Sequence, residues 1–500
     1  MAPSPEQRAA HRERAVAALC APDLAAIVDL VVWVEDGTAY AANHLGRVRW
    51  NGDDARELLA GVDPIGSEDP MAFLPYEREV ADPSPRLSTG NAYPYAAARL
   101  HSFFADPERS PDLAIVHTPR HRFLDEGGHI GEHGSLDVIQ SRAPLVLSGA
   151  GVARRGYVDD HARLVDVGPT LAVLSGVPED ALADADGTPL DGRPLTAYLD
   201  GPPPRHVVGI LWDGAPSGDL LHLAETGELP ALARLVERGT ALRGGAVAEF
   251  PSVTLTNHTA ILTGVGPGRH GVMGNVYYDR ATGETVVPND ETTWHRSAEW
   301  LKPSVRTVFE MVGDLLPPSE SARTASVNEA IDRGADYSTM QVIRATSTGG
   351  AGSLDDLLPD PTGSPYLGEP TFLDDRYFRW GVRVDDVGLD QVLQLWADPS
   401  TSPPPRLTWW AHVVTDAGHH GAGPRSEMAR DALRQSDARL GRFLDHLDEQ
   451  GVLDDVAFLL TADHGFEGSH PDVTGSWRGV LEGLGVPFLD EGPGLVYFTD

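Results

Sequence analysis

Carboxylates and imidazoles stand directly after three apolar runs of the sequence, where they could bind metal ions. These residues are Asp213, Asp416, His420, Asp463 and His464, which follow the runs 206–212, 408–414 and 456–461. Residues just past the carboxyl ends of parallel strands collect at one edge of a sheet. Together with one further histidine, this set of oxygen and nitrogen ligands suits two tetrahedral zinc sites with open positions, without any cysteine.

The individual signals differ in strength. An aspartate after a strand is often only a helix cap, so Asp213 alone indicates little. Asp463 and His464 follow a very apolar run, and burying both is costly unless they pair or bind metal. Asp416 and His420 lie four residues apart among glycines, which favours a loop folded around an ion, and His419 is a rival for the same role.

A hydroxyl that could act as a nucleophile is found at Thr254, where a helical stretch opens after a turn. The start of a helix offers free N–H groups and the positive end of the helix dipole, which stabilise both an alkoxide and a phosphoryl group. A helix cap is the alternative role for Thr254, and Thr256 shares it.

Alternating strand and helix patterns predict the strands and helices that position these residues. Short apolar runs indicate buried parallel strands at 114–116, 144–147, 206–212, 408–414 and 456–461. Amphipathic stretches between them indicate helices at 229–238, 308–315 and 427–450. We therefore expect an α/β fold with a parallel sheet covered by helices.

Composition excludes several classes of partner. The chain has 500 residues, a formal charge of -35 and a single lysine, Lys302. Such a charge repels nucleic acid polymers and anionic membrane surfaces. The one cysteine, Cys20, excludes an internal disulfide. The N-terminal residues hold no apolar core of signal-peptide length, and no later apolar run approaches the length of a membrane helix. We expect a soluble cytoplasmic protein.

Five motifs resemble those of the alkaline phosphatase superfamily, in particular its nucleotide pyrophosphatase/phosphodiesterase branch and phosphonoacetate hydrolase. They are Thr-Leu-Thr-Asn-His (254–258), His-Gly-Val-Met-Gly-Asn (270–275), Asp-Ala-Gly-His-His-Gly-Ala-Gly-Pro (416–424), Ala-Asp-His-Gly (462–465) and Glu-His-Gly-Ser-Leu-Asp (132–137). The first departs from the family pattern because Thr256 replaces a proline. The last resembles the late His-Gly motif of the family and favours His133 over His129 and His470.

The resemblance implies a role for each matching residue. Thr254 would be the nucleophile and Asn275 the amide that binds the phosphoryl group. One zinc ion would be held by Asp416, His420 and His133. The other would be surrounded by Asp213, Asp463, His464 and Thr254. Manganese or iron could replace zinc on the same ligands.

The order of the motifs is unusual, because the His133 motif precedes all the others. The resemblance therefore implies an alkaline-phosphatase-like fold in circularly permuted order, with the Pro-rich run 201–205 joining the exchanged parts. The expected divisions are a C-terminal-type part of the core (1–200), the linker (201–205), an N-terminal-type part with the nucleophile (206–275), a small cap or insert (276–400) and a metal-binding part (401–500). His133 could reach the site in its own chain or across a swapped homodimer.

The expected activity is hydrolysis of phosphodiester or phosphoanhydride bonds through a phosphothreonine intermediate. Asn275 donates only a neutral hydrogen bond, which suits a diester monoanion better than a monoester dianion. The substrate would be a small phosphodiester, nucleotide or phosphonate, and Tyr277, Tyr278 and Trp294 could stack a base. A phosphonate hydrolase and a phosphomonoesterase are alternatives, whereas a phosphomutase and a zinc-binding scaffold fit less well. Sulfatase chemistry is disfavoured because no cysteine lies near Thr254.

Overall fold

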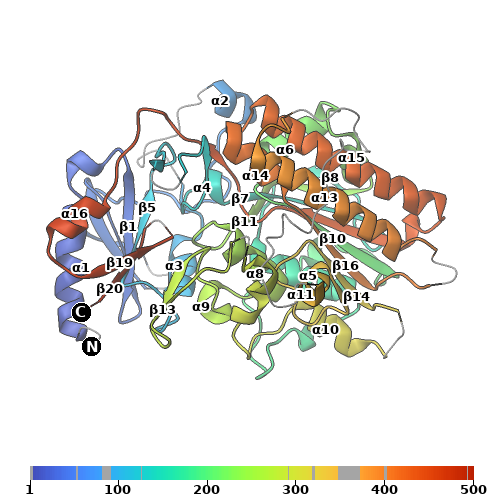
Figure 1. Cartoon of the computed structure of the whole chain (residues 1–500), viewed down its shortest axis with the longest axis horizontal. Helices are drawn as coiled ribbons and strands as arrows, with labels where there is room; N and C mark the ends of the chain where they lie inside the picture. Colours follow the sequence, from blue (N-terminus) through green and yellow to red (C-terminus); the bar gives the residue numbers. More distant parts are fainter. Residues whose placement is uncertain are drawn as a thin grey trace.

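The structure is a computed structural model with helices packed around β-sheets (Figure 1). It describes residues 4–499 except 52–54, 82–91, 125–126, 291, 318–320, 347–371, 399–401 and 493. The predicted α/β class, with a mostly parallel sheet sandwiched between helices, is confirmed.

The larger sheet has nine strands and carries the predicted ligand residues. Its order is β15-β14-β16-β10-β17-β7-β11-β8, with β9 also paired to β11. The first five strands are mutually parallel, and β7 runs antiparallel to both of its neighbours. The strands are β7 (Arg142–Gly149), β8 (Gly156–Val158), β9 (Ala162–Arg163), β10 (His206–Trp212), β11 (Gly239–Val247), β14 (Thr324–Val327), β15 (Tyr337–Ser338), β16 (Leu407–His412) and β17 (Val456–Thr461).

The central strands are apolar because both of their faces are covered. Every residue of β16 and β17 is buried, which is typical of a parallel sheet between two helical layers. Gly209 of β10 lies against the Trp409 ring, and a Cβ atom there would be 2.3 Å from that ring. The glycine therefore lets a large indole pack on the strand beside it.

A smaller sheet of seven strands is antiparallel throughout, with the order β19-β20-β5-β1-β2-β3-β4. Its strands are β1 (Val28–Glu35), β2 (Thr38–Ala42), β3 (Gly46–Trp50), β4 (Glu57–Gly61), β5 (Leu113–His117), β19 (Phe488–Glu491) and β20 (Leu495–Phe498). The first and last parts of the chain thus share one sheet, and both ends of the chain lie beside it (Figure 1).

Two of the predicted parallel strands are antiparallel in the structure. The run 114–116 lies in β5 of the smaller sheet, and the run 144–147 lies in β7 between β17 and β11. The prediction of direction was wrong because a short apolar run reports burial, and either strand direction can satisfy burial.

Helices cover both faces of the larger sheet (Figure 1). One layer contains α6 (Ser217–Glu225), α7 (Pro230–Glu237), α13 (Arg376–Leu395), α14 (Val414–Ala422) and α15 (Glu427–Glu449); the other contains α5 (Val167–Leu174), α8 (Thr254–Thr263), α9 (Pro267–His270), α10 (Val308–Leu315) and α11 (Thr339–Thr346). α1 (Pro5–Leu19) and α16 (Arg478–Gly483) pack together beside the smaller sheet. Ser426 caps α15 by accepting a hydrogen bond from Ala429 N–H at 3.1 Å.

A two-stranded pairing brings the His133 segment to the larger sheet. β6 (Gly131–Glu132) pairs with β18 (Glu467–Gly468), just after the Asp463 and His464 segment. Gly131 lies so close to α14 that a Cβ atom there would be 2.3 Å from His419 O. The absence of a side chain at Gly131 therefore allows the close approach, and His133 follows two residues later.

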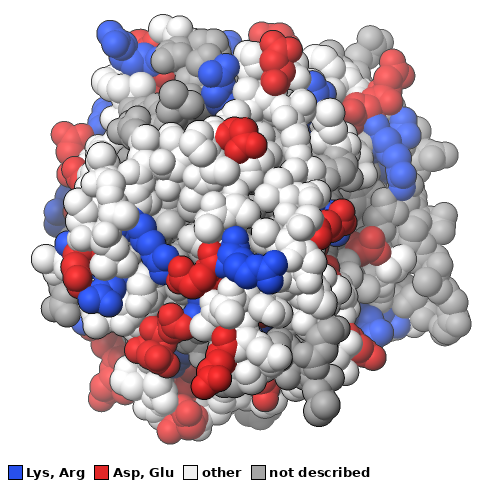
Figure 2. Space-filling view, turned by 90° about the vertical axis from the view of Figure 1, so that its left-hand side faces the viewer, with Lys and Arg blue, Asp and Glu red and all other residues white. Residues whose placement is uncertain are grey.

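The face that includes the smaller sheet shows acidic and basic side chains mixed with one another among uncharged ones (Figure 2). The negative formal charge therefore does not form a field of one sign on this face. Among the described helices, none has the length and apolar character needed to cross a membrane.

Candidate metal and phosphoryl-transfer site

Three ligand atoms converge at a deep position past the ends of β10 and β17. His464 Nε2 lies 3.1 Å from Asp463 Oδ2 and 3.9 Å from Asp213 Oδ1. All three side chains are buried, and none of these three atoms has a hydrogen-bond partner. Buried polar atoms are normally satisfied, so the donor set fits a bound divalent cation.

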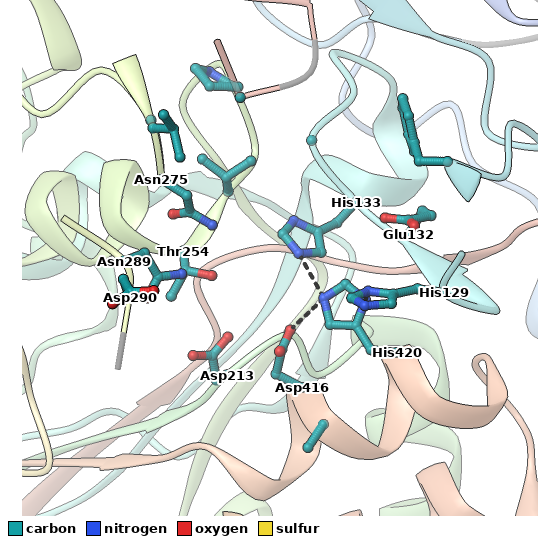
Figure 3. A pocket seen from close by; sticks show the side chains of 18 of the residues that line it. His129, Glu132, His133, Asp213, Thr254, Asn275, Asn289, Asp290, Asp416 and His420 are labelled. Carbon is teal, nitrogen blue, oxygen red and sulfur yellow. Dashed lines mark hydrogen bonds and ion pairs between the residues drawn. The ribbon is translucent and has the colours of Figure 1, made fainter. Parts of the chain in front are cut away.

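A second, outer group of ligand atoms lies closer to solvent. His420 Nε2 is 3.2 Å from His133 Nε2 and 3.6 Å from Asp416 Oδ1 (Figure 3). The side chains of His420 and Asp416 are 19% and 25% exposed. Asp416 also belongs to a candidate ligand group with Asp213 and His464. The two positions are therefore adjacent, and the carboxylate of Asp416 lies between them.

The three imidazoles present the same nitrogen to these positions. His133 Nδ1 is 3.0 Å from Ser252 O, His420 Nδ1 is 3.0 Å from Gly131 O, and His464 Nδ1 is 3.0 Å from Gly465 O. A Nδ1–H that donates to a backbone carbonyl leaves Nε2 as the unprotonated ligand atom.

Burial shapes the charge of the site. Burial, followed by repulsion from Asp463 and Asp416, raises the pKa of Asp213 well above its usual value. Burial also raises the pKa of Asp416 to about 6 and lowers the pKa of His420 to about 3. The imidazole is therefore in the neutral form that binds metal, and the carboxylates need a nearby cation to ionise at low cost.

Thr254 and Asn275 lie on the cavity side of these ligands (Figure 3). Thr254 is the first residue of α8 and is 8% exposed. Asn275 Oδ1 accepts a hydrogen bond from Leu255 N–H at 3.1 Å. This bond fixes the amide, so that its NH2 group is left to donate to a group bound in front of Thr254.

The site opens into a cavity of about 650 Å³, a volume typical of small-molecule sites. Its walls come from the smaller sheet, from the segments that follow strands of the larger sheet and from the region 276–400. The smaller sheet and its connections contribute apolar side chains, and the region 276–400 contributes aromatic and polar ones. The lining includes Ile115, Phe123 and Leu495 from the smaller sheet and its connections, and from the region 276–400 it includes Asn289, Asp290, Thr292, Trp294, Arg376, Tyr377 and Trp380.

All eight residues predicted for the site therefore lie in one region of one chain. Asp416 and His420 differ from expectation in their local structure, because they lie on helix α14 and not in a loop. A spacing of four residues places both side chains on the same helix face. His419 is buried and stacks on Phe466 at 5.3 Å between ring centroids, and its Nδ1 faces Thr415 O at 2.6 Å.

The aromatic residues expected to stack a base are divided. Trp294 lines the cavity. Tyr277 is fully buried, and Tyr278 packs against Tyr497 at 5.7 Å between ring centroids. Neither tyrosine is among the described residues that line the cavity, whereas Trp380, which sequence reasoning missed, is.

Sequence reasoning also missed a buried pair behind the deep position. His258 Nδ1 lies 2.9 Å from Glu329 Oε2, and His258 Nε2 lies 3.6 Å from Oδ2 of both Asp213 and Asp463. His258 stands four residues after Thr254, a spacing that places it on the same helix face and could have revealed it. Glu329 follows β14, and no pattern in the sequence marks it.

Two further cavity residues, His129 and Glu132, form a candidate ligand group with His420. His129 Nδ1 is 2.8 Å from His420 Nδ1. The histidine that was set aside in favour of His133 therefore also lies at the site, on the far side of the His420 ring (Figure 3).

The fold and the site define an α/β protein with two adjacent groups of candidate metal ligands beside a threonine at a helix start. Residues 207–481, more than half of the chain, match the model of the family described as type I phosphodiesterase / nucleotide pyrophosphatase. The chain belongs to this family. The predicted resemblance is thereby confirmed.

Individual relatives match parts of the chain. An uncharacterized pyrophosphatase/phosphodiesterase of Schizosaccharomyces pombe is 24% identical over 225 residues, 44% of this chain and 37% of that protein. Alkaline phosphatase PafA of Elizabethkingia meningoseptica is 35% identical over 94 residues, 18% of this chain and 17% of that protein. The chain thus covers less than two thirds of the length of both proteins.

Two solved structures are also similar in part. Phosphonoacetate hydrolase from Sinorhizobium meliloti in complex with phosphonoformate is 25% identical and has a TM-score of 0.34, with 53% of this chain and 57% of that chain covered. Murine ectonucleotide pyrophosphatase / phosphodiesterase 5, as an inactive variant in complex with AMP, is 14% identical and has a TM-score of 0.37, with 52% and 57% covered.

Proposed function

We propose that this protein is a metal-dependent hydrolase of phosphodiester or phosphoanhydride bonds in small molecules, such as nucleotides. Two divalent ions, preferably zinc, would occupy the deep and outer positions. The observation that carries this proposal is the convergence of unpaired ligand atoms beside Thr254 and Asn275 at the floor of one cavity. A scaffold protein has no need for a hydroxyl and an amide at that place.

Each residue of the site would have a separate role in the reaction. The ions, when bound, would lower the pKa of the Thr254 hydroxyl and neutralise charge on the leaving oxygen. Thr254 Oγ1 forms a bond to phosphorus while the bond to the leaving oxygen breaks, and the departing alcohol or phosphate takes up a proton. Water then attacks the phosphothreonine from the opposite face and releases the second product. Asn275 donates to a non-bridging oxygen throughout.

The charge of the cavity favours a diester over a monoester. Arg376 is the one lysine or arginine among the described lining residues, and Asn275 is uncharged. A monoester dianion gains more from an arginine fork beside the phosphoryl group than from a neutral amide. The apolar and aromatic walls are suited to the organic groups of a diester.

A phosphonate hydrolase that binds its substrate through a lysine is disfavoured by the position of Lys302. Its Nζ lies 2.7 Å from Asp106 Oδ2, and Lys302 does not line the cavity. The single lysine of the chain is therefore engaged elsewhere.

The unusual order of the motifs agrees with a circular permutation, which we also propose. The family match begins at residue 207, at the start of β10, and leaves His133 outside it. β20 and β1 both pair with β5, so the two ends of the chain adjoin in one sheet. Exchange of the two parts would therefore require only a short new connection.

Hydrolysis of bis(p-nitrophenyl) phosphate and of p-nitrophenyl phosphate, measured with added zinc at mildly alkaline pH, tests the proposal. We expect clear preference for the diester. Preference for the monoester would indicate a phosphatase, and turnover of neither would favour a phosphonate hydrolase, a mutase or a scaffold.

A further inference from the structure

His258 and Glu329 form a buried hydrogen-bonded pair directly behind the deep metal position. His258 is 1% exposed and Glu329 is fully buried. His258 Nδ1 lies 2.9 Å and 3.1 Å from the two carboxylate oxygens of Glu329. An ionised carboxylate only accepts hydrogen bonds, so Nδ1 carries the proton that is donated to Glu329.

Glu329 is held rigidly by two other donors. Trp409 Nε1–H donates to Oε2 at 2.8 Å, and Ile331 N–H donates to Oε1 at 2.9 Å. A buried carboxylate needs such partners to offset its lost hydration. Since Glu329 is fixed by β16 and by its own loop, it also fixes the plane and direction of the His258 ring.

The other nitrogen of His258 lies between the carboxylates of the deep position. Nε2 is 3.6 Å from Asp213 Oδ2 and 3.6 Å from Asp463 Oδ2, and it has no hydrogen-bond partner. The second oxygen of Asp463, Oδ1, accepts a hydrogen bond from Gly214 N–H at 2.9 Å. Asp213 Oδ1 and Asp463 Oδ2 remain unpaired and lie toward His464 Nε2.

These contacts give the two oxygens of each carboxylate different surroundings. Asp463 is oriented by Gly214 through one oxygen, and Asp213 has His258 as its neighbour at the equivalent oxygen. Asp213 Oδ1 and Asp463 Oδ2 are left for the ion, and Asp463 Oδ2 also faces His258 Nε2 at 3.6 Å. Outer contacts of this kind orient metal ligands and set metal affinity.

We propose that Glu329 and His258 are positioning residues of the deep metal site. Glu329 orients the His258 ring. The ring, with Nε2 3.6 Å from Oδ2 of both carboxylates, limits how Asp213 and Asp463 can turn, so that Asp213 Oδ1 and Asp463 Oδ2 converge on one ion. The proposal rests on the proposed function in that it needs an ion at the deep position. It does not depend on which substrate is hydrolysed.

The direct test is zinc binding to metal-free protein by competition with a chromophoric chelator, measured on the variants Glu329→Gln, His258→Gln and His258→Ala. Loss of an outer contact of a metal ligand typically costs roughly 10- to 100-fold in metal affinity or activity. We expect losses in that range for Glu329→Gln and His258→Ala at one of the two zinc equivalents. His258→Gln should recover part of the affinity, because its side chain keeps a polar group and much of the ring's volume beside the same carboxylates.

Glu249→Gln is the matched control. Glu249 is also a fully buried glutamate, but its partner is Arg163 at 2.7 Å. This variant should lower the unfolding temperature of the metal-free protein and leave zinc affinity unchanged. Circular dichroism of each variant without metal establishes that it is folded.

Two results would overturn the proposal. The first is wild-type zinc affinity in folded Glu329→Gln protein, which would make the pair structural only. The second is complete loss of one zinc equivalent in both His258 variants, which would make His258 a ligand. A wild-type protein that binds zinc but hydrolyses no bis(p-nitrophenyl) phosphate would refute the proposed function, while the zinc affinities would still decide the positioning role.

Discussion

The amide of Asn275 allows a sharp test of how the phosphoryl group is held. Its Oδ1 accepts from Leu255 N–H, and its NH2 group faces the cavity. Asn275→Ala removes both functions, whereas Asn275→Asp keeps the acceptor for Leu255 and replaces the donor with a negative charge. The two variants therefore separate the structural contact from the catalytic one.

The expected magnitudes follow from these contacts. A hydrogen bond to a charged group contributes about 1.5–3 kcal/mol, and about 1.4 kcal/mol corresponds to a tenfold change in rate. Asn275→Ala should thus lower kcat/KM for bis(p-nitrophenyl) phosphate by roughly 10- to 150-fold. Asn275→Asp should lower it further, because the carboxylate repels the phosphoryl oxygens.

The two variants should rank in the opposite order for stability, with Asn275→Ala losing more than Asn275→Asp. Asn275→Ala leaves Leu255 N–H without its acceptor, which costs about 1–3 kcal/mol if water does not replace it. Asn275→Asp retains the acceptor and should unfold close to the wild-type temperature. The assay is kcat/KM for the diester together with thermal unfolding of the same preparations. Equal activity of Asn275→Asp and wild type, or a greater loss in Asn275→Ala than in Asn275→Asp, would refute the reasoning.

Three further predictions follow from the site and its surroundings. Thr254→Ala should abolish turnover and leave zinc binding by the six remaining ligands largely intact, as measured by product release and metal content; normal turnover would contradict the nucleophile assignment. His133→Ala should weaken binding of the outer ion at least tenfold. The reason is that loss of a contact that only orients a ligand already costs roughly tenfold or more in metal affinity, and loss of a ligand should cost no less. A zinc titration that shows two unchanged equivalents would exclude His133 as a ligand. Burial raises the pKa of Asp385 to about 7 from an ordinary value of 3.8, so the folded state binds more protons than the unfolded state between these values, and stability should fall as the pH rises from about 4 to 7. Urea unfolding of metal-free protein should show a smaller decline across that range in Asp385→Asn than in the wild type, and an identical decline would argue against this carboxyl as a source.

Much of the larger sheet could be predicted because its strands are buried on both faces. β10, β16 and β17 read as continuous apolar runs, and a polar residue follows within a few positions of each run's end. The smaller sheet could not be predicted as a unit, because its strands come from both ends of the chain and only their pairing reveals them. The direction of β7 was missed for the same reason, since pairing partners are not encoded within one short run.

The candidate site, too, could be predicted from the sequence only in part. The residues of the two ligand groups have distinctive types and spacings, and the motif resemblance assigned a role to each of them. Trp380, Glu132 and Glu329 were missed as members of the site because each is a single side chain on an element whose local pattern has another explanation. His129 was weighed and set aside in favour of His133. Only packing shows that they face the cavity or the ligands.

The sequence by itself determined the chemical groups of this protein and the strand ends that present them, because residue type and hydrophobic period are local properties. It also determined the family, since the motifs are contiguous. The tertiary structure decided which oxygen or nitrogen of each candidate ligand lacks a protein partner, and how β6 and β18 carry His133 to Asp416 and His420. It also decided that the smaller sheet and the segments following the larger sheet's strands wall the cavity together. These features depend on contacts between segments that lie far apart in the sequence. Such contacts form only when the chain folds and its apolar surfaces pack against one another.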